Sequence, residues 1–355
     1  MPARAASKVA LMIAFATSSS ASVLYTVSDI GTLGGRIDGY AINNRGEVTG
    51  SAGTSPMNSF HAFLYADGYI RDLGSLGAID YRNEFSSVGM AINDSGQVAG
   101  TSRTADGSYH AYLYTGGAMV DLGTLGGRQS AAYGINNAGE VTGNSESPSR
   151  VPYAFVYSDG QMMQIGPLGH SDTSGSDINN IGQIVGGADN TISRLEAFLY
   201  MDGQTVWLGS LGGGNTEALA LNDHGQVTGS SSPPAAYPHA YFYADGTMTD
   251  IAPQWYYSVG TAISNQGEVV GYYAAGSVSR PFVYSGGVSA DLLDMIDPAL
   301  GITSGEARGV NDVGQILLNA NAHTYILTPV PEPAGTFLLV FGLFAWGLAK
   351  GRAVV

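Results

Sequence analysis

Cysteine is absent from this sequence of 355 residues, and lysine is almost absent. Without cysteine the chain needs no disulfide in an oxidising compartment and offers no thiolate for catalysis or metal binding. Lys8 and Lys350 are the only lysines and lie in the two terminal segments, so arginine is the sole strong base between them. The net charge is −15. Nucleic-acid binding relies on neutralising phosphates with Lys and Arg, so no nucleic acid is expected as a partner.

Charged residues are also scarce, at 12% of the chain, whereas there are 51 glycines and 21 tyrosines. Tyrosine favours half-buried pleated strands, and glycine favours the tight turns between them. The composition therefore predicts an all-β fold with little helix between the two ends of the chain.

The N-terminal segment has the features of an export signal. Arg4 and Lys8 precede an apolar stretch over residues 9–16, and small residues follow over 17–22. A basic start, an apolar stretch and small residues before the cleavage point are typical of a signal peptide. An ordinary amphipathic helix is the alternative, but the apolar stretch has no polar face. We therefore expect residues 1–22 to be a signal peptide and the protein to leave the cytoplasm.

The C-terminal segment combines a short motif with one apolar run. Pro331-Glu332-Pro333 is followed by an apolar run over residues 334–349 and then by Lys350. About sixteen helical residues reach only ~24 Å, slightly less than the ~30 Å hydrocarbon core of a bilayer. The long side chain of Lys350 can extend that reach, and its charge favours the cytoplasmic side. We therefore expect one transmembrane helix that anchors the chain.

This order of elements resembles the PEP-CTERM sorting signal of Gram-negative proteins that are processed by an exosortase. The resemblance covers residues 330–355. It implies temporary anchoring in the inner membrane, cleavage near residues 331–333 by an exosortase-type enzyme, and release to the cell surface or the exopolysaccharide matrix. A chance Pro-Glu-Pro before a permanent anchor is the alternative.

Between these ends the sequence repeats roughly every 43 residues. One block has the form apolar-Asn-Asn/Asp-x-Gly-Glu/Gln-Val. Its first Asn position is occupied by Asn43, Asn93, Asn136, Asn179, Asn222, Ser264 and Asn311. A second block reads His-Ala-Phe-Leu-Tyr where it first occurs. The second blocks begin at His61, His110, Tyr153, Glu196, His239, Arg280 and His323. A third block, Asp-Leu-Gly followed by Thr/Ser-Leu-Gly-Gly, completes the unit.

These blocks resemble the HAF family of extracellular repeats, which is named for the residues found here as His61, Ala62 and Phe63. The resemblance covers nearly all of the chain between the two end signals. It implies an extracellular repeat protein and does not imply any particular biochemical activity.

Two turn signals divide each unit into four strands. Asn44-Arg45-Gly46 suits a type I turn that ends with glycine in the left-handed region, and this turn joins a first strand to a second. Asp67-Gly68 suits a tight hairpin because both positions tolerate positive φ, and this turn joins a third strand to a fourth. Four short strands in ~43 residues match one propeller blade.

The third strand indicates how the units pack. Ala62 and Leu64 lie on one of its faces, Phe63 and Tyr65 lie on the other, and both faces are apolar. A sheet with one face in water would alternate polar and apolar residues, so we expect both faces to be buried between neighbouring units. A radial stack and a flat solenoid both satisfy this pattern.

The chain ends favour a closed ring. The last unit, residues 309–327, has three strands and lacks the fourth, whereas residues 25–35 form a complete fourth-strand block before any first strand. Pairing of the N-terminal strand with the last repeat would close the ring and remove unpaired sheet edges. We therefore expect a seven-bladed β-propeller over residues 23–329, with six or eight blades as alternatives.

Binding is expected on one face of the propeller. The connections from second to third strand, and from one unit to the next, vary in length and share that face, and loops on a rigid scaffold often carry function. Their aromatic and arginine side chains could stack against sugar rings, or each could pack under its own loop. These candidate ligand-binding residues are Tyr81, Arg82, Tyr237, Trp255 and Tyr256.

No metal, cofactor or catalytic site is expected. Four of the six histidines begin a third strand, which lies away from the axis, so hydrogen bonding at the strand start is favoured over a metal ring. The four are His61, His110, His239 and His323. The Asn-Asn/Asp sites are interpreted as turn caps, because they lack the acidic positions of a calcium loop. His170 and His224 fall outside the repeat, but no neighbouring residue gives either a role.

Two hypotheses follow for the function. The first is a non-enzymatic surface or matrix protein whose propeller binds exopolysaccharide or an envelope protein, or has a purely structural role. The second is a secreted propeller enzyme that acts on polysaccharide, with His170 and His224 as its best candidates for catalysis.

Overall fold

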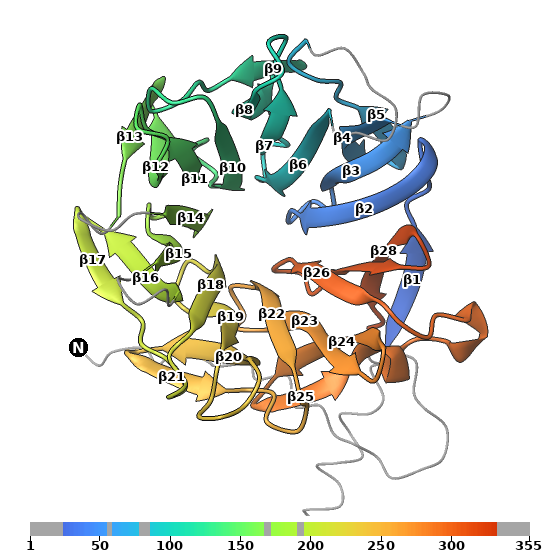
Figure 1. Ribbon diagram of the computed structural model, residues 1–355. Helices are drawn as coiled ribbons and strands as arrows, with labels where there is room; N and C mark the ends of the chain where they lie inside the picture. Colours follow the sequence, from blue (N-terminus) through green and yellow to red (C-terminus); the bar gives the residue numbers. More distant parts are fainter. Residues whose placement is uncertain (1–23, 55–58, 78–85, 167–171, 190–194, 332–355) are drawn as a thin grey trace, which may run out of the picture.

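The computed structural model describes residues 24–54, 59–77, 86–166, 172–189 and 195–331. Seven four-stranded antiparallel sheets stand around a central axis as the blades of a propeller (Figure 1). The predicted all-β, seven-bladed β-propeller is therefore confirmed. The expected signal peptide and the expected transmembrane helix lie outside the described residues. Within the described residues, no helix is long and apolar enough to cross a membrane.

Each blade runs from an innermost strand at the axis to an outermost strand at the rim. The first three blades are β2 (Gly34–Ile42), β3 (Val48–Thr54), β4 (Ser59–Ala66) and β5 (Tyr69–Asp72); β6 (Ser87–Ile92), β7 (Val98–Arg103), β8 (Tyr109–Thr115) and β9 (Ala118–Asp121); and β10 (Ser130–Ile135), β11 (Val141–Glu146), β12 (Pro152–Ser158) and β13 (Gln161–Gln164). The next three are β14 (Thr173–Ile178), β15 (Ile184–Asp189), β16 (Leu195–Met201) and β17 (Gln204–Trp207); β18 (Thr216–Leu221), β19 (Val227–Ser231), β20 (His239–Ala244) and β21 (Thr247–Asp250); and β22 (Ser258–Ile263), β23 (Val269–Ala275), β24 (Val278–Ser285) and β25 (Val288–Asp291).

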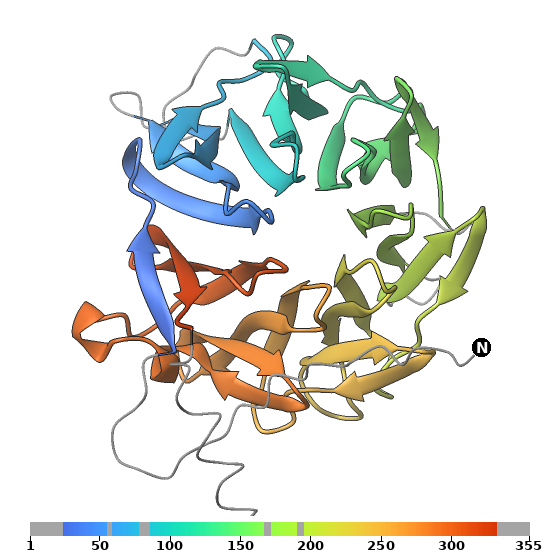
Figure 2. The same cartoon turned by 180° about the vertical axis from the view of Figure 1, so that it is seen from behind.

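The seventh blade joins the two ends of the chain. Its strands are β26 (Glu306–Val310), β27 (Ile316–Ala320), β28 (His323–Pro329) and, at the rim, β1 (Tyr25–Asp29). β1 and β28 are antiparallel, with Tyr25 opposite Pro329 and Asp29 opposite Tyr325. Figure 2 shows the blue β1 beside the red β28. The predicted closure by the N-terminal strand is therefore confirmed.

Both kinds of turn have the expected conformation. The Gly46 N–H donates to the Asn43 carbonyl oxygen at 3.0 Å, and Gly46 has a φ of +75°. In the hairpin between the third and fourth strands, Asp67 and Gly68 have φ values of +53° and +80°. Because the strands of a blade alternate in direction, these tight turns share one face of the propeller, which we call the hairpin face. The remaining connections share the opposite, connection face.

The hydrophobic core lies between the blades. Ala62 and Leu64 of β4 pack with Ile92, Val98 and Tyr112 of the second blade. The other side of β4 packs toward the seventh blade. Both faces of a third strand are therefore buried, as its apolar pattern predicted.

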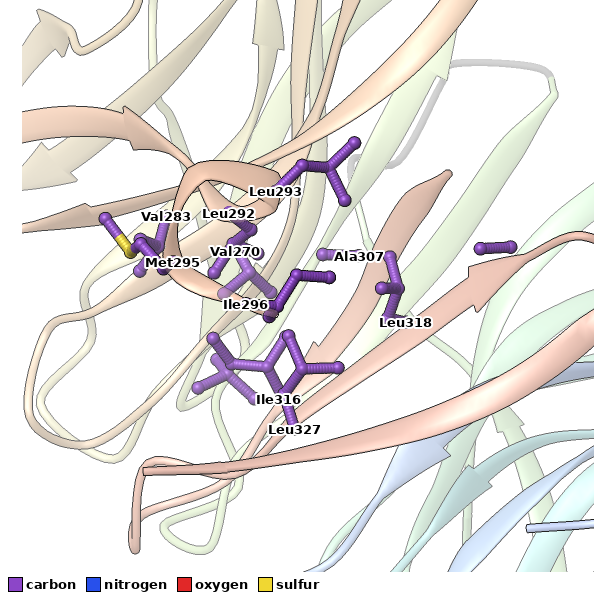
Figure 3. Close-up of a cluster of buried hydrophobic side chains, with 12 residues drawn as sticks. Val270, Val283, Leu292, Leu293, Met295, Ile296, Ala307, Ile316, Leu318 and Leu327 are labelled. Atoms are coloured by element: carbon purple, nitrogen blue, oxygen red, sulfur yellow. The ribbon is translucent and has the colours of Figure 1, made fainter. Parts of the chain in front are cut away.

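An additional pair of short helices lies between the sixth and seventh blades. The 3-10 helices η1 (Leu292–Met295) and η2 (Pro298–Leu300) precede β26. Ile296, which follows η1, belongs to one buried cluster with Ile316 and Leu327 of the seventh blade (Figure 3). This connection therefore adds apolar contacts at the blade that the N-terminal strand completes.

Each residue of the His-Ala-Phe block has a structural role. His61 Nδ1 lies 2.9 Å from Asp72 Oδ1 at the end of β5. The Ala62 N–H donates to Ser87 Oγ of the next blade at 2.8 Å, and the Ala62 side chain is fully buried. Phe63 is also fully buried. The block therefore ties the third strand to the rim strand, to the next blade and to the core.

Asparagine side chains join neighbouring blades near the axis. Asn43 Oδ1 accepts the N–H groups of Arg45 and Glu47 within its turn, and Asn43 Nδ2 donates to the Asn93 carbonyl oxygen at 2.9 Å. Equivalent bonds link blades at six of the seven junctions. Ser264 occupies the seventh position, and its hydroxyl accepts only within its own turn. The interpretation of these sites as turn caps is confirmed, and they also hold the blades together.

The residue after each of these positions belongs to a second ring, which is closed. At every junction its backbone N–H donates to Oδ1 of the equivalent residue in the next blade, at 2.7–2.9 Å. The members are Asn44, Asp94, Asn137, Asn180, Asp223, Asn265 and Asp312. Asn265 Nδ2 also donates to the Oδ2 atoms of both Asp223 and Asp312. The ring borders a cavity of 170 Å³ on the hairpin face.

Candidate functional site

Each innermost strand contains a β-bulge at the equivalent position of its blade. The pairing of β2 with β3 passes from Gly39 to Ala41 and leaves Tyr40 without a partner. A bulge redirects the side chain of its extra residue and is common beside functional sites. The bulged residues of the seven blades are Tyr40, Met90, Tyr133, Ser176, Leu219, Thr261 and Arg308.

All seven bulged residues line one central cavity of 410 Å³, which we call the channel cavity. This volume falls within the ~300–1,000 Å³ of typical ligand pockets. Asp172, Ser174 and Glu217 also line it. Asp172 belongs to the connection that precedes β14, so the cavity reaches the connection face.

The lining of the channel cavity differs from blade to blade. Two residues after the bulge every blade has an aliphatic side chain, as in Ile42 and Val310. The bulge position instead holds residues as different as Tyr40, Ser176 and Arg308. The repeated scaffold does not require this variation. The variation gives the cavity an asymmetric wall, which suits an asymmetric ligand. The sequence analysis did not identify these residues, although this variable position within a regular repeat was the available signal.

The charges of the cavity are unevenly compensated. Arg308 forms an ion pair with Glu306, and its Cζ lies 5.6 Å from the centre of the Tyr272 ring. Asp172 and Glu217 have no basic partner in the part of the chain that the structure describes. Glu217 is exposed overall, but partial desolvation within the cavity raises the pKa of its carboxyl group. The cavity therefore combines a neutralised arginine with two uncompensated acidic groups.

A second cavity, of 350 Å³, adjoins the first on the connection face and shares Tyr40 and Arg308 with it. Arg36 and Asp38 lie on its wall and form an ion pair of 2.8 Å. Both arginines that line this second cavity, Arg36 and Arg308, are thus matched by carboxylates.

Two of the predicted ligand-binding residues form an exposed pair. Tyr237 lies in the connection before β20 and Tyr256 in the connection before β22, both on the connection face. Their ring centres are 4.2 Å apart at an interplanar angle of 42°, and the residues are 54% and 64% exposed. A hydrogen bond with Tyr237 raises the pKa of Tyr256. We call these two residues the tyrosine pair.

The structure places the neighbouring tryptophan differently. Trp255 stacks on Tyr273, with ring centres 4.0 Å apart and an interplanar angle of 4°, and its ring centre lies 5.2 Å from that of Phe282. It packs against the buried cluster between the fifth and sixth blades. Trp255 therefore anchors its loop, which was the alternative interpretation of the sequence.

Several predicted residues lie outside the described residues and have no structural placement. These are Tyr81, Arg82, His170, Glu332 and Pro333. Pro331 is the last described residue and is exposed.

The repeated histidines lie beside aspartates at the ends of the rim strands. Their Nδ1 atoms are 2.7–2.9 Å from a carboxylate oxygen. The pairs are His61 with Asp72, His110 with Asp121, His239 with Asp250, and His323 with Asp29. In the sixth blade Arg280 pairs with Asp291 instead. Hydrogen bonding at the strand start is confirmed for His61, His110 and His239, whereas His323 Nδ1 lies close to Asp29 without making a hydrogen bond. Among the described residues there is no group of three potential metal ligands.

Asp177 breaks the repeat near the axis. The equivalent position is alanine or glycine in every other blade, as in Ala41 and Gly134. Asp177 accepts the N–H groups of Ile178 at 2.9 Å and of Leu221 in the next blade at 3.1 Å. Burial, assisted by the charge of Asp223, raises its pKa to about 7 against these hydrogen bonds. The sequence analysis missed this departure from the repeat.

No family model and no curated protein matches the sequence. The β-propeller domain of the Trilobed protease from Pyrococcus furiosus, which has an open velcro topology, gives a TM-score of 0.56 at 10% identity over 86% of this chain and 94% of that chain. The S511A mutant of puromycin hydrolase, complexed with PGG, gives 0.56 at 16% identity over 81% and 50%. The acylaminoacyl peptidase of Pyrococcus horikoshii gives 0.53 at 11% identity over 89% and 55%. This chain spans about half the length of the last two, and the likeness shows the fold alone.

Proposed function

We propose that this protein is exported and binds a glycan of the cell surface or exopolysaccharide matrix, without enzymatic action. The tyrosine pair is the observation that carries the proposal. Tyrosine offers a flat apolar face together with a hydroxyl, which suits a ring bearing hydroxyl groups. Two such rings lie together and exposed on the face where the loops vary. Covering them with a ligand would remove apolar surface from water at about 25 cal/mol per Å².

The positions of the chain ends support the proposed export and sorting. The Val330 N–H donates to the Leu24 carbonyl oxygen at 2.8 Å, so both end segments leave the propeller at the seventh blade. A C-terminal helix after Pro331 would hold the propeller by one edge. Cleavage by an exosortase-type enzyme near residues 331–333 would then release an intact ring, because every strand that the structure describes ends before the motif.

Sorting predicts two processed ends. We expect the protein recovered from the cell surface to have an intact mass that lacks residues 1–22 and the segment after Pro331. In a strain without the processing enzyme, the C-terminal segment should remain and the protein should stay in the membrane fraction. An unprocessed C-terminus on surface protein from the normal strain would instead indicate a permanent anchor.

Within the described residues, no observation comparable to the tyrosine pair favours the enzymatic alternative. His224 lies in an exposed turn on the hairpin face, where its N–H donates to Asn222 Oδ1, and this face is opposite the mouth of the channel cavity. The other candidate, His170, lies outside the described residues.

Removing both rings of the tyrosine pair is expected to weaken glycan binding. We expect Tyr237→Ala combined with Tyr256→Ala to weaken co-sedimentation with the host exopolysaccharide at least about tenfold, which corresponds to ~1.4 kcal/mol. Tyr69→Ala is the matched control, since Tyr69 is 79% exposed but follows a turn of the hairpin face. Equal binding by the double variant and this control would contradict the proposed function.

A further inference from the structure

The channel cavity is a second candidate binding site, separate from the tyrosine pair. The pair belongs to the connections around the fifth blade, whereas the cavity is bordered by the innermost strands of all seven blades. The seven bulges aim one side chain per blade into the same space. Binding here would not require the tyrosine pair.

The acidic groups of the cavity gather on neighbouring blades. Asp172 precedes β14 of the fourth blade, and Glu217 lies on β18 of the fifth. Across the axis, Arg308 of the seventh blade is neutralised by Glu306. A cation entering the cavity would therefore meet uncompensated negative charge, whereas an anion would have to displace Glu306. The net charge of −15 also favours the approach of cations.

The remaining wall has an apolar part, formed by Met90, Leu195 and Leu219, and a polar part that suits a hydroxylated ring. Tyr133 lies on the third blade, next to the acidic side, and Tyr40 lies on the first. Ser174 and Ser176 add hydroxyl groups that can both donate and accept hydrogen bonds. The Thr261 hydroxyl already donates to the carbonyl oxygens of Val270 and Ala307, so it can offer a ligand only an acceptor. A thin aliphatic chain such as that of lysine would leave these hydroxyl groups unused.

We propose that the channel cavity binds an amino sugar, with its ammonium group held by Glu217 and Asp172 and its ring lying against the tyrosine and hydroxyl side chains. The ammonium group supplies the counter-charge that these carboxylates lack within the described chain. The proposal goes beyond the glycan binding assigned to the tyrosine pair, because it names a different site and a charged group on the ligand.

Calorimetry on the full-length protein with a glucosamine tetramer tests this site. We expect the wild type to bind the glucosamine tetramer at least about tenfold more tightly than its N-acetylated counterpart, which has no ammonium group. Glu217→Gln keeps the shape of the side chain and should remove at least about tenfold of the affinity for the glucosamine tetramer. Equal affinity for the two tetramers, or unchanged affinity in Glu217→Gln, would overturn the proposal.

The controls separate site binding from general attraction to an acidic protein. Asp159→Asn removes one exposed carboxylate from a hairpin-face turn and should leave the affinity unchanged. Loss of binding in this variant would indicate non-specific charge attraction and overturn the proposal. Tetralysine that binds as tightly as the glucosamine tetramer would overturn the assignment to a sugar. The double variant of the tyrosine pair should still bind the glucosamine tetramer. The proposal for the channel cavity and the proposal for the tyrosine pair can therefore fail independently of each other.

Discussion

Replacing Gly143 with alanine should destabilise the propeller by about 3 kcal/mol, the upper end for overpacking. A Cβ atom at this position would lie 1.9 Å from the Ala131 carbonyl oxygen and 2.9 Å from Ala132 Cα. Both atoms belong to the backbone of β10 beside its bulge, so no side chain can move to make room. The strand pairing itself would have to shift. The midpoint of urea denaturation measures the loss.

Gly53→Ala provides the matched control for this prediction. Gly53 lies in the equivalent strand of the first blade, but its Cβ would meet Gly35 Cα at 3.4 Å, an ordinary contact. We expect its stability to change by less than about 0.5 kcal/mol. Equal effects of the two substitutions would show that the close approach at Gly143 does not limit stability.

Six of the seven second strands share this close approach. In each, an added Cβ would lie 1.9–2.0 Å from a carbonyl oxygen of the innermost strand. The six glycines are Gly50, Gly100, Gly143, Gly186, Gly229 and Gly271. The seventh blade has Leu318 opposite Ala307, so its strands tolerate a side chain there. In these six blades the bulged innermost strand approaches the second strand too closely for any residue but glycine, whereas the bulge of the seventh blade leaves room for a side chain.

The fold could be predicted because its signals are local. Asn44-Arg45-Gly46 and Asp67-Gly68 fix turns through the φ values that their residues tolerate, and these turns divide each repeat into strands. The missing fourth strand of the last repeat and the isolated block at residues 25–35 then favoured a closed ring, and in the structure β1 completes the seventh blade. Each step depended on residues near one another in the sequence or on counting repeats.

The site could not be predicted in the same way because it depends on partner strands. A regular strand alternates its side chains between two faces, but a bulge changes that alternation at Tyr40 and its equivalents. The repeat pattern shows that these residues differ and does not show where they point. Likewise, Trp255 and Tyr256 are adjacent aromatics in one loop, yet only the packing of Tyr273 against Trp255 distinguishes the half-buried residue from the exposed one.

Asp177→Asn should change the unfolding free energy, relative to wild type, more favourably at pH 8 than at pH 4.5. We expect this difference between the two pH values to be about 2 kcal/mol. The pKa of Asp177 is raised from 3.8 to about 7 in the folded chain. Its contribution to stability is therefore fully present below the unfolded value and is lost as the pH rises through the folded value. Asparagine cannot ionise and avoids this loss. The full shift in the pKa of Asp177 would correspond to about 4 kcal/mol of unfolding free energy. The carboxyl group borders a cavity that water can enter, and because water stabilises the ionised form, we expect about half of that value.

The effect is measured as the difference in unfolding free energy between variant and wild type across this pH range. Asparagine has one carbonyl oxygen and can retain only one of the two N–H bonds from Ile178 and Leu221, which costs about 1 kcal/mol at any pH. Asp177→Ala, which introduces the residue of most other blades, loses both bonds but should show the same pH dependence. A constant difference from pH 4.5 to pH 8 in both variants would contradict the raised pKa.

Asp72→Asn should show the opposite sign in the same experiment. Burial would raise the pKa of Asp72, but hydrogen bonds from His61 and the Gly74 N–H, with the charge of His61, hold it below its ordinary value. This pair therefore stabilises the fold above the unfolded pKa and loses its contribution as the pH falls. The Asp72 variant should be less stable than wild type at pH 8, and the gap should narrow at low pH. Opposite trends at the rim and at the axis would assign the pH dependence to these two carboxyl groups, since a general change in net charge would move both variants in the same direction.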